Sequence, residues 1–279
     1  MKRQKPQQLQ RYALITGAAS GLGKAAASFL NQQGFVVFAC DRDFKETVHE
    51  GNLHKINMDV SDDASVTAAF EYVRAQTDRL DIVSCFAGII SAGALMETET
   101  NEALRMFDVN VLGAFRVNRA AFEMVRAAKG RYINISSEYG KLKSVPFYTL
   151  YPATKHALEM YNIGLRRELR MFNIPVVCIR PGAYKTDIIN SFTTMYDRAI
   201  EKSELYKPQL QRVSGLMNSE FAKAKEPAAF IKTFRKAAFA RRPKFVYKTN
   251  NSLTMKLLNI LPMKLQDKLV YKMLFKKAK

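Results

Sequence analysis

A tyrosine and a lysine four residues apart, Tyr151 and Lys155, are the side chains of this sequence best suited to transfer a proton. Residues i and i+4 lie on one face of a helix, so the two side chains would stand together. A phenol ordinarily ionises near pH ~10, and a neighbouring ammonium favours the phenolate, the form that removes a proton from an alcohol. Pro152 fits a helix only in its first turn, which puts Tyr151 at the helix mouth.

Nearby residues compete for these roles. Tyr139 and Lys143 have the same spacing, but Gly140 lies between them and no helical pattern continues the segment, so we favour the first pair. Ser137 follows an apolar run and is the candidate to hydrogen-bond a substrate oxygen beside the tyrosine. Its neighbour Ser136 is the alternative.

A glycine-rich segment near the amino terminus, TGAASGLG, lies between an apolar run and a helical pattern. Glycines allow a tight turn and a close approach of backbone to a phosphate, and the following helix offers free N–H groups and a partial positive charge. The spacing, Gly-x-x-x-Gly-x-Gly, differs from the common dinucleotide fingerprint, so a tight turn without a ligand is the alternative interpretation. The residues expected to bind a dinucleotide here are Thr16, Gly17, Ser20, Gly21, Leu22 and Gly23.

Acidic residues follow the next two apolar runs. Asp41 comes 24 residues after Gly17, where a carboxylate can accept hydrogen bonds from an adenosine ribose and repel a 2′-phosphate. This favours NAD over NADP, although Arg42 would partly neutralise the charge; the alternative is that Asp41 only caps the next segment. Asp59 and Val60 follow the third run, where a side chain would meet the adenine or an aspartate would simply form a turn.

The elements that must hold these residues alternate along the chain. Apolar runs predict buried strands, and the segments between them have helical spacing. This alternation predicts an α/β fold with a doubly wound parallel sheet that binds ligands beyond the carboxyl ends of its strands. The predicted strands are 12–16, 35–40, 54–58, 81–86, 131–136, 175–179 and 244–247, and the predicted helices are 21–33, 61–77 with Ser61 as its N-cap, 102–128 and 151–171.

Taken in order, these motifs resemble those of the short-chain dehydrogenase/reductase family over about residues 10–190, and more loosely to about residue 248. TGAASGLG resembles the glycine motif of that family, and PGAYKT resembles its nicotinamide-side loop. The resemblance implies a single Rossmann-type domain and an NAD(P)-dependent enzyme that oxidises alcohols or reduces carbonyl compounds. It also implies a homodimer formed through the two long helices.

The same resemblance assigns roles to individual residues. The catalytic set it implies is Asn110, Ser137, Tyr151 and Lys155. Lys155 would also hold the nicotinamide ribose, and Asn110 would position a water that continues the proton path. The remaining cofactor contacts implied by the family are Tyr151, Pro181, Gly182 and Thr186.

The chain departs from the family after the fourth predicted strand, where Cys85-Phe86-Ala87-Gly88 replaces Asn-Asn-Ala-Gly. The small Ala87 and Gly88 still let the backbone pass close to the cofactor, but the side-chain hydrogen bonds of two asparagines are lost. No catalytic group is removed. The alternative function, a catalytically weak dinucleotide-binding scaffold or membrane-surface protein, rests on this change and on the basic carboxyl-terminal segment.

Composition narrows the class of protein. Hydrophobic residues make up 48% of 279, enough for a large core. The three cysteines, Cys40, Cys85 and Cys178, lie in apolar runs and are expected to be reduced core residues of a cytoplasmic protein; no Cys/His cluster has the spacing of a metal site. The amino terminus lacks a hydrophobic stretch and no run of about 18 apolar residues occurs, so we expect neither a signal peptide nor a transmembrane helix.

The net charge of +19 is concentrated near the carboxyl terminus, where residues 201–279 hold 19 Lys/Arg and 5 Asp/Glu. We expect residues 1–251 to form the catalytic domain and residues 252–279 a basic amphipathic extension that Pro262 divides into two short helices. This extension would either lie on an anionic membrane or pack its apolar face on the domain and leave its lysines in water. Nucleic-acid binding is disfavoured, because no stacking platform or reading helix accompanies the lysines.

A variable lid over the substrate is expected at about residues 187–225, and its apolar side chains suit a lipophilic substrate or simply form the core of a helical cap. We therefore expect an enzyme that interconverts a hydrophobic alcohol and its carbonyl compound, cytoplasmic, with peripheral membrane contact through 252–279 as one option. The apolar lid residues are Ile188, Ile189, Phe192, Met195, Tyr196, Leu205, Tyr206, Leu210, Leu216, Met217 and Phe221.

Overall fold

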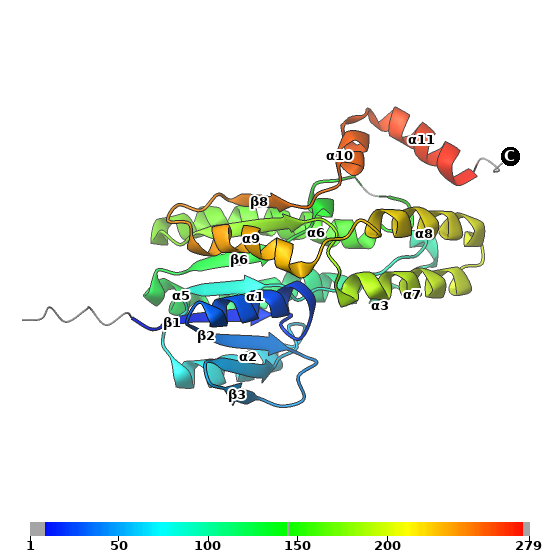
Figure 1. Ribbon diagram of the computed structural model, residues 1–279. Coiled ribbons are helices and arrows are strands. Elements are labelled where there is room, and N and C mark those ends of the chain that lie inside the picture. The colour runs from blue at the N-terminus through cyan, green and yellow to red at the C-terminus, as the bar shows by residue number, and fades with distance from the viewer. Residues whose placement is uncertain (1–8, 144, 276–279) are drawn as a thin grey trace, which may run out of the picture.

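The predicted strands form one sheet in the computed structural model, which describes residues 9–143 and 145–275 (Figure 1). The strand order is β3-β4-β2-β1-β5-β6-β7-β8, and all neighbours pair in parallel except β3, which is antiparallel to β4. The prediction of a doubly wound, mostly parallel α/β sheet is confirmed. The strands are β1 (Arg11–Thr16), β2 (Phe35–Asp41), β3 (Val48–Glu50), β4 (Leu53–Asn57), β5 (Ile82–Cys85), β6 (Arg131–Ile135), β7 (Val176–Pro181) and β8 (Val246–Thr249).

Helices flank the sheet on both sides (Figure 1). Several short 3₁₀ turns connect them, of which η3 (Glu138–Gly140) follows β6. The α-helices are α1 (Gly21–Gln32), α2 (Asp63–Gln76), α3 (Thr100–Phe107), α4 (Gly113–Ala120), α5 (Phe122–Ala128), α6 (Leu150–Glu168), α7 (Asp187–Lys202), α8 (Lys207–Phe221), α9 (Pro227–Phe239), α10 (Leu253–Ile260) and α11 (Met263–Phe275).

Successive side chains of each strand enter two separate hydrophobic layers. In β1, Leu14 packs beneath α2, α4, α5 and α6, whereas Ala13 and Ile15 pack beneath α1 and α9. Burying one Leu or Phe fully in such a layer stabilises the fold by roughly 1.5–3 kcal/mol. Because both faces of the sheet are covered, its strands read in the sequence as unbroken apolar runs.

The start of α2 differs from the prediction. Asp62 and not Ser61 is the N-cap, because the Asp62 side chain accepts a hydrogen bond from the Ala64 amide at 2.9 Å. Ser61 instead donates its hydroxyl to Asp59 at 2.6 Å. A local carboxylate two residues away is the better partner for this serine, so the cap moves one residue along.

The long helix predicted over 102–128 is not uniform. It consists of α3, a π-helical turn η2 (Asp108–Leu112), α4 and α5. A π turn accommodates one extra residue and changes which side chains face inward, and Asn110 within it is buried. Strand β3 was not predicted, because its three residues are all exposed and carry no apolar pattern.

The strand order reverses between β1 and β5, which are neighbours in the sheet although β2, β3 and β4 lie between them in the chain. Loops leaving two such strands diverge to opposite faces and open a crevice at their carboxyl ends. The glycine segment follows β1, and Ala87 and Gly88 follow β5. The fold therefore brings both segments to the two sides of this crevice.

Helices α7 and α8 follow β7, and the two ends of this region are joined by a hydrogen bond from the Lys185 amide to the Lys225 carbonyl at 2.8 Å. Pro262 separates α10 from α11; both lie at the edge of the molecule, and α11 lies next to α8 (Figure 1). Within 9–143 and 145–275, no helix is long and apolar enough to cross a membrane. The side chains of Ile188 and Ile189, and residues 276–279, lie outside the described residues.

Candidate active site

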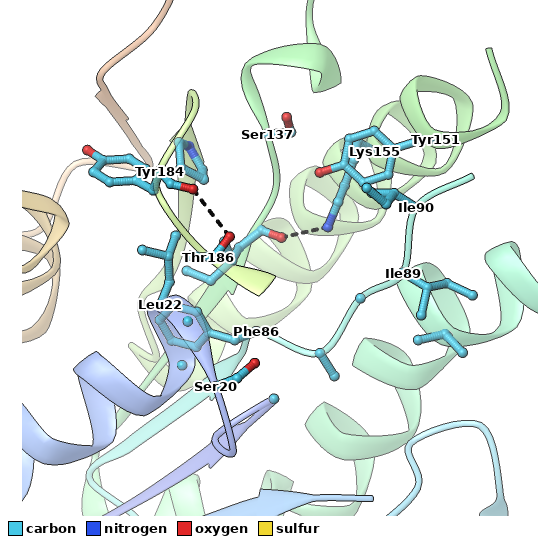
Figure 2. Close-up of a pocket in the computed structure, with 18 of the residues that line it drawn as sticks. Ser20, Leu22, Phe86, Ile89, Ile90, Ser137, Tyr151, Lys155, Tyr184 and Thr186 are labelled. Carbon is cyan, nitrogen blue, oxygen red and sulfur yellow. Dashed lines mark hydrogen bonds between the residues drawn. The ribbon is translucent and has the colours of Figure 1, made fainter. Parts of the chain in front are cut away.

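A pocket at the carboxyl ends of the parallel strands contains most of the residues singled out in the sequence (Figure 2). Ser20 and Leu22 stand at one end of it, and Tyr151, Lys155 and Ser137 at the other. Thr16 and Asn110 do not line the pocket; both are buried behind its wall. The predicted residues that do line it are Gly17, Ser20, Gly21, Leu22, Gly23, Asp41, Arg42, Asp59, Val60, Ala87, Gly88, Ser137, Tyr151, Lys155, Pro181, Gly182 and Thr186.

The glycine turn is shaped by a close approach of two backbone segments. Gly17 has φ +66°, and a Cβ atom there would lie 2.7 Å from the Ala87 amide nitrogen. Thr16 joins the same segments, since its Oγ1 accepts hydrogen bonds from the amides of Phe86 and Ala87, each at 3.2 Å. The first turn of α1, which starts at Gly21, carries no acidic side chain, so its N–H groups remain suited to an anionic ligand.

Asp41 connects the end of β2 to the glycine turn. Its Oδ2 accepts a hydrogen bond from the Ala19 amide at 2.9 Å, and its Oδ1 accepts one from the Asp43 amide at 3.1 Å. A carboxylate oxygen can accept more than one hydrogen bond, so Asp41 can still receive ribose hydroxyls. Arg42 lies 3.8 Å from the Asp43 carboxylate and is half exposed at the same end of the pocket.

Asp59 is held in its ionised form. Partial burial alone would raise the pKa of this carboxyl, but hydrogen bonds from the Ser61 hydroxyl and amide, with the charges of Arg42 and Arg105, keep the pKa below its ordinary value. Val60 follows directly and also lines the pocket. The pair forms the far wall of the nucleotide end.

Tyr151 and Ser137 lie near each other at the other end of the pocket. Burial raises the pKa of Tyr151 to about 12; the nearby Ser137 hydroxyl opposes this shift, and the negative charge of Glu138 adds to it. The expectation that Lys155 favours the phenolate is therefore not met by these protein groups alone, because desolvation is the larger effect. Ser136, the competitor of Ser137, also lines the pocket, but its Oγ lies close to Gly140 and Glu159.

Lys155 stands beside Tyr151 on the same face of α6. Its Nζ lies 5.6 Å from the centre of the Tyr151 ring and donates a hydrogen bond to the Ile135 carbonyl at 3.1 Å (Figure 2). Burial lowers the pKa of Lys155 to about 8, while the charges of Cys178, Glu159 and Cys85 act in the opposite direction. An ammonium with one protein acceptor retains further donors for a ligand.

A buried ion pair supports this arrangement and was not predicted from the sequence. Glu159, one helical turn after Lys155, accepts hydrogen bonds from Arg180 Nε at 2.7 Å and Nη2 at 2.8 Å. Burial alone would raise the pKa of Glu159, but Arg180 holds it below its ordinary value. The pair ties α6 to the end of β7, directly before Pro181.

Asn110 acts as a clamp on the pocket wall. Its Oδ1 accepts from the Ile89 amide at 2.8 Å, and its Nδ2 donates to the Ile89 carbonyl at 2.9 Å and to Thr154 Oγ1 at 3.0 Å. The Thr154 hydroxyl in turn donates to the Tyr151 carbonyl at 2.8 Å. The side chain of Asn110 thus fixes the loop after β5 to the first turn of α6.

The departure at Cys85-Phe86 leaves the loop after β5 well supported. Cys85 is buried, and its Sγ donates to Asn118 Oδ1 at 3.5 Å. The Phe86 ring packs on Phe230 and Phe234, with ring centres 5.8 and 5.7 Å apart. The hydrogen bonds that the Phe86 and Ala87 amides donate to Thr16 Oγ1 hold the backbone here, so the loop does not depend on asparagine side chains.

The outer part of the pocket is lined by aromatic side chains that the sequence motifs did not identify as site residues. Tyr148 stacks on Tyr151 with ring centres 5.4 Å apart, and Phe192 packs on Phe221 at 4.2 Å. Tyr139 also lines the pocket. The sequence pointed to them only through the apolar composition of the lid, because these residues meet through tertiary packing.

The competing pair of Tyr139 and Lys143 is separated by the fold. Tyr139 lies in η3, whereas Lys143 Nζ donates to the Leu261 carbonyl, between α10 and α11, at 3.3 Å. Glu138, next to Ser137, lines the pocket, and its Oε2 accepts a hydrogen bond from the Ser252 amide at 2.7 Å. The start of the carboxyl-terminal extension therefore contacts the active-site loop.

Comparison with known proteins identifies one family, the short chain dehydrogenases. The sequence profile of the short chain dehydrogenase family matches residues 11–197. A 3-ketodihydrosphingosine reductase from Bacteroides thetaiotaomicron is 33% identical over 174 residues, which cover 62% of this chain. The match spans 64% of that reductase, less than two thirds of its length.

Solved structures show the same fold. A short-chain dehydrogenase from Streptomyces avermitilis superposes with a TM-score of 0.75 at 24% identity, covering 95% of this chain and 97% of that one. A 3-ketoacyl-(acyl-carrier-protein) reductase from Brucella melitensis, complexed with NADH, gives a TM-score of 0.69 at 22% identity, covering 86% of this chain and 96% of that one.

Proposed function

The chain belongs to the short-chain dehydrogenase/reductase family, and on that premise we propose that it is an NAD-dependent oxidoreductase that interconverts a hydrophobic alcohol and its carbonyl compound. The observation that carries the proposal is the position of Tyr151, which stands beside Lys155 and near Ser137 in the pocket that also contains the glycine turn. A phenol, a hydroxyl and an ammonium so arranged suit proton transfer to a substrate oxygen.

The residues present fit a dinucleotide. The Gly17 backbone approaches Ala87 too closely for a side chain, and the free N–H groups of α1 suit a pyrophosphate between Ser20 and Gly23. Asp41 would accept the adenosine ribose hydroxyls and repel a 2′-phosphate, which favours NAD over NADP. Asp59 and Val60 would flank the adenine, and the nicotinamide side would be held by Ala87, Gly88, Pro181, Gly182 and Thr186.

Each catalytic side chain has a distinct role in the proposal. A bound nicotinamide would exchange the hydride and, when oxidised, bring a positive charge that lowers the pKa of Tyr151. Ser137 orients the substrate oxygen by a hydrogen bond. Tyr151 takes the hydroxyl proton during oxidation and returns it during reduction, and Lys155 holds the nicotinamide ribose. Asn110 keeps the wall beside them rigid through Ile89 and Thr154.

A hydrophobic substrate is favoured by the outer part of the pocket. Its walls there are the rings of Tyr139, Tyr148, Phe192 and Phe221, with few charged groups to bind a polar substrate. The similarity to a 3-ketodihydrosphingosine reductase supports the same class, a carbonyl compound with a lipophilic chain. A steroid-, retinoid- or fatty-type alcohol meets these requirements.

A homodimer is part of the proposal. Large apolar side chains are exposed on the two long helical segments that the family uses for dimers: Leu104 of α3, Leu112 of η2 and Phe115 of α4 on the first, and Met160 of α6 on the second. Joining this face to its copy would remove it from water. Sedimentation of the wild type and of Met160→Glu tests this: we expect a dimer that becomes a monomer, and a wild-type monomer would refute it.

We also propose a cytoplasmic enzyme that contacts membranes peripherally through residues 252–279. The concentration of positive charge in residues 201–279 supports an attraction to anionic surfaces. Contact of this kind needs no spanning helix.

The decisive experiment is a titration of the purified protein with NADH and with NADPH, followed by nicotinamide fluorescence. We expect tighter binding of NADH, and Asp41→Ala should reduce that preference by about tenfold because the ribose acceptor and the repulsion are both lost. Glu46→Ala, at an exposed carboxylate of the same loop that does not line the pocket, is the matched control. Tighter binding of NADPH would reverse the cofactor assignment, and binding of neither would favour the non-catalytic scaffold.

The substrate class is tested by a screen of alcohols and ketones of increasing chain length with the preferred cofactor. We expect kcat/KM to rise with apolar surface, by roughly tenfold for each two methylenes that enter the pocket. A preference for small polar alcohols would contradict the hydrophobic assignment while leaving the oxidoreductase chemistry intact.

A further inference from the structure

The two carboxyl-terminal helices expose their apolar side chains. Leu253, Leu257 and Ile260 of α10 are 67%, 58% and 70% exposed, and none of the residues of α10 is buried. On α11 only Gln266 and Leu274 are buried. The further exposed apolar residues of α11 are Met263, Leu265, Leu269, Tyr271, Met273 and Phe275. An amphipathic helix that packs on its own domain shows the opposite arrangement.

Positive charges alternate with these apolar side chains. Lys256, Lys264, Lys268 and Lys272 are exposed on the same two helices, where Asp267 is the one acidic residue between 252 and 275. In the part of the chain that the structure describes, no carboxylate pairs with any of the four lysines. We call the exposed apolar residues and the four lysines of α10 and α11 the tail surface.

The tail surface is fixed to the domain by polar contacts. Asn259 Oδ1 accepts from the Lys143 amide at 2.7 Å, and Arg212 Nη1 donates to the Leu274 carbonyl at 2.6 Å. At the start of α10, the Ser252 amide donates to Glu138. These polar contacts hold the helices in place together with Met255, Val270 and Leu274, which pack on the domain, and the other large apolar side chains of the two helices remain exposed.

The inner side of the same helices continues the wall of the substrate pocket. Leu274, Met255 and Val270 pack into one hydrophobic cluster with Tyr148 and Phe192, which line the pocket. Figure 1 shows α11 beside α8, with α10 leading to it, outside the layers that cover the sheet. A lipophilic molecule at the tail surface would therefore lie against the elements that enclose the outer pocket.

The positive charge of the tail surface favours one class of binding partner over the others. A second copy of this chain would bring four more lysines to the same contact in a protein of net charge +19, and like charges oppose such a pairing. A nucleic acid would use the lysines but gain nothing from the exposed Leu and Ile side chains. An anionic lipid bilayer satisfies both, because phosphate headgroups attract the lysines and the acyl boundary accepts the apolar residues.

We propose that α10 and α11 dock on an anionic lipid bilayer, and that the enzyme takes its lipophilic substrate from that bilayer through the lid. The docking deepens the membrane contact proposed for residues 252–279, and the substrate route rests on the proposed oxidoreductase function. The helices lie in the plane of the interface, with their lysines at the headgroups and their apolar side chains at the acyl boundary.

Flotation of the full chain with vesicles tests the docking. We expect binding to phosphatidylcholine vesicles that contain phosphatidylserine, about tenfold or more weaker binding to phosphatidylcholine alone, and weakening by added salt. The double variants Leu257→Glu/Ile260→Glu and Lys264→Glu/Lys268→Glu should each reduce binding at least tenfold. Matched controls are Leu9→Glu, at an exposed leucine, and Arg241→Glu/Arg242→Glu, at exposed arginines after α9; both should bind as the wild type does.

Several results would overturn the docking proposal. Equal binding to both kinds of vesicle would remove the role of charge, and wild-type-like binding by the tail variants would place the contact elsewhere. A change of sedimentation in the tail variants without any vesicle binding would identify a second copy as the occupant. Binding of a DNA duplex that depends on Lys264 and Lys268 but not on Leu257 and Ile260 would identify a nucleic acid.

The substrate route is tested with one lipophilic substrate supplied either in vesicles or in dilute solution. The tail variants should lower kcat/KM about tenfold for the vesicle supply and leave it unchanged in solution, with unchanged NADH binding. An equal effect in both conditions would overturn the route. Vesicle binding without any turnover by the wild type would refute the proposed function and leave the docking intact.

Discussion

The nucleotide end and the substrate end of the pocket are built by different means. At the nucleotide end, backbone groups set the shape by meeting other backbone atoms or short polar side chains: Gly17 approaches Ala87, the Phe86 and Ala87 amides donate to Thr16 Oγ1, and the Ala19 amide donates to the Asp41 carboxylate. At the substrate end, the walls are aromatic side chains from η3, α6 and the lid. A site shaped mainly by backbone atoms keeps its form when side chains change, as at Cys85-Phe86. A site whose walls are side chains binds a different ligand when those side chains change.

Replacing Tyr151 with Phe tests whether the two ends are separable. We expect kcat to fall by about 10²–10⁴-fold, because the proton donor and acceptor is lost, while the affinity for NADH changes less than about twofold. Tyr161→Phe removes a hydroxyl from the same helix outside the pocket and should retain activity. Substantial residual turnover in Tyr151→Phe would refute its catalytic role, and loss of NADH binding would show that the ends are coupled.

Glu159 forms a buried ion pair with Arg180 between α6 and the end of β7, so replacing it should lower the free energy of unfolding. Breaking a buried ion pair from one side costs about 3–5 kcal/mol, so Glu159→Gln should lower the free energy of unfolding by that order. The same substitution at Glu123, whose pair with Arg126 is exposed, should cost less than about 1 kcal/mol. Urea denaturation of both variants measures the difference, and equal losses would contradict the buried role.

The lowered pKa of the buried Lys155 makes the free energy of unfolding depend on pH. The folded-state pKa of about 8 lies below the ordinary 10.5, so the unfolded chain binds more protons between these values. Wild-type stability should therefore rise with pH across this window relative to Lys155→Met, by up to about 3 kcal/mol. Thermal unfolding of both proteins between pH 7 and pH 10 checks the sign, and a constant difference would contradict it.

Gly17→Ala should separate close approach from backbone strain at the nucleotide end. Gly17 and Gly34 both have positive φ, +66° and +80°, but a Cβ atom at Gly34 would meet nothing within 4 Å. Both alanine variants should lose about 1–2 kcal/mol of stability from strain. Only Gly17→Ala should also weaken NADH binding, by about tenfold, in a fluorescence titration. Equal NADH affinities would mean that the backbone contact does not shape the site.

The sequence was most informative where residues follow strands. Asp41, Ser137 and Pro181 come from three different strands, and the parallel sheet brings them to one edge, so their meeting could be predicted from order alone. Tyr151 and Lys155 were placed by helical spacing. The direction of the Tyr151 pKa shift was not predictable, because it depends on burial by residues distant in the chain.

Other features have no local signal in the sequence. The π turn around Asn110 interrupts a helical pattern that contains neither Pro nor a clear break. Glu159 and Arg180 are 21 residues apart; the predicted helix 151–171 contains the first, the predicted strand 175–179 ends just before the second, and nothing local pairs them. The exposed apolar face of α10 was one of two options in the sequence, because amphipathic spacing identifies a face without naming what covers it.

The hydrogen bond between Ser252 and Glu138 affects how activity measurements on truncated forms of this protein should be interpreted. Glu138 is one residue from Ser137, and its negative charge contributes to the raised pKa of Tyr151. A truncation before Ser252 would remove that amide donor, together with Leu274 from the cluster beside the lid. Such a fragment is a different catalyst, so a loss of activity on truncation would not by itself demonstrate that the missing piece was a membrane anchor.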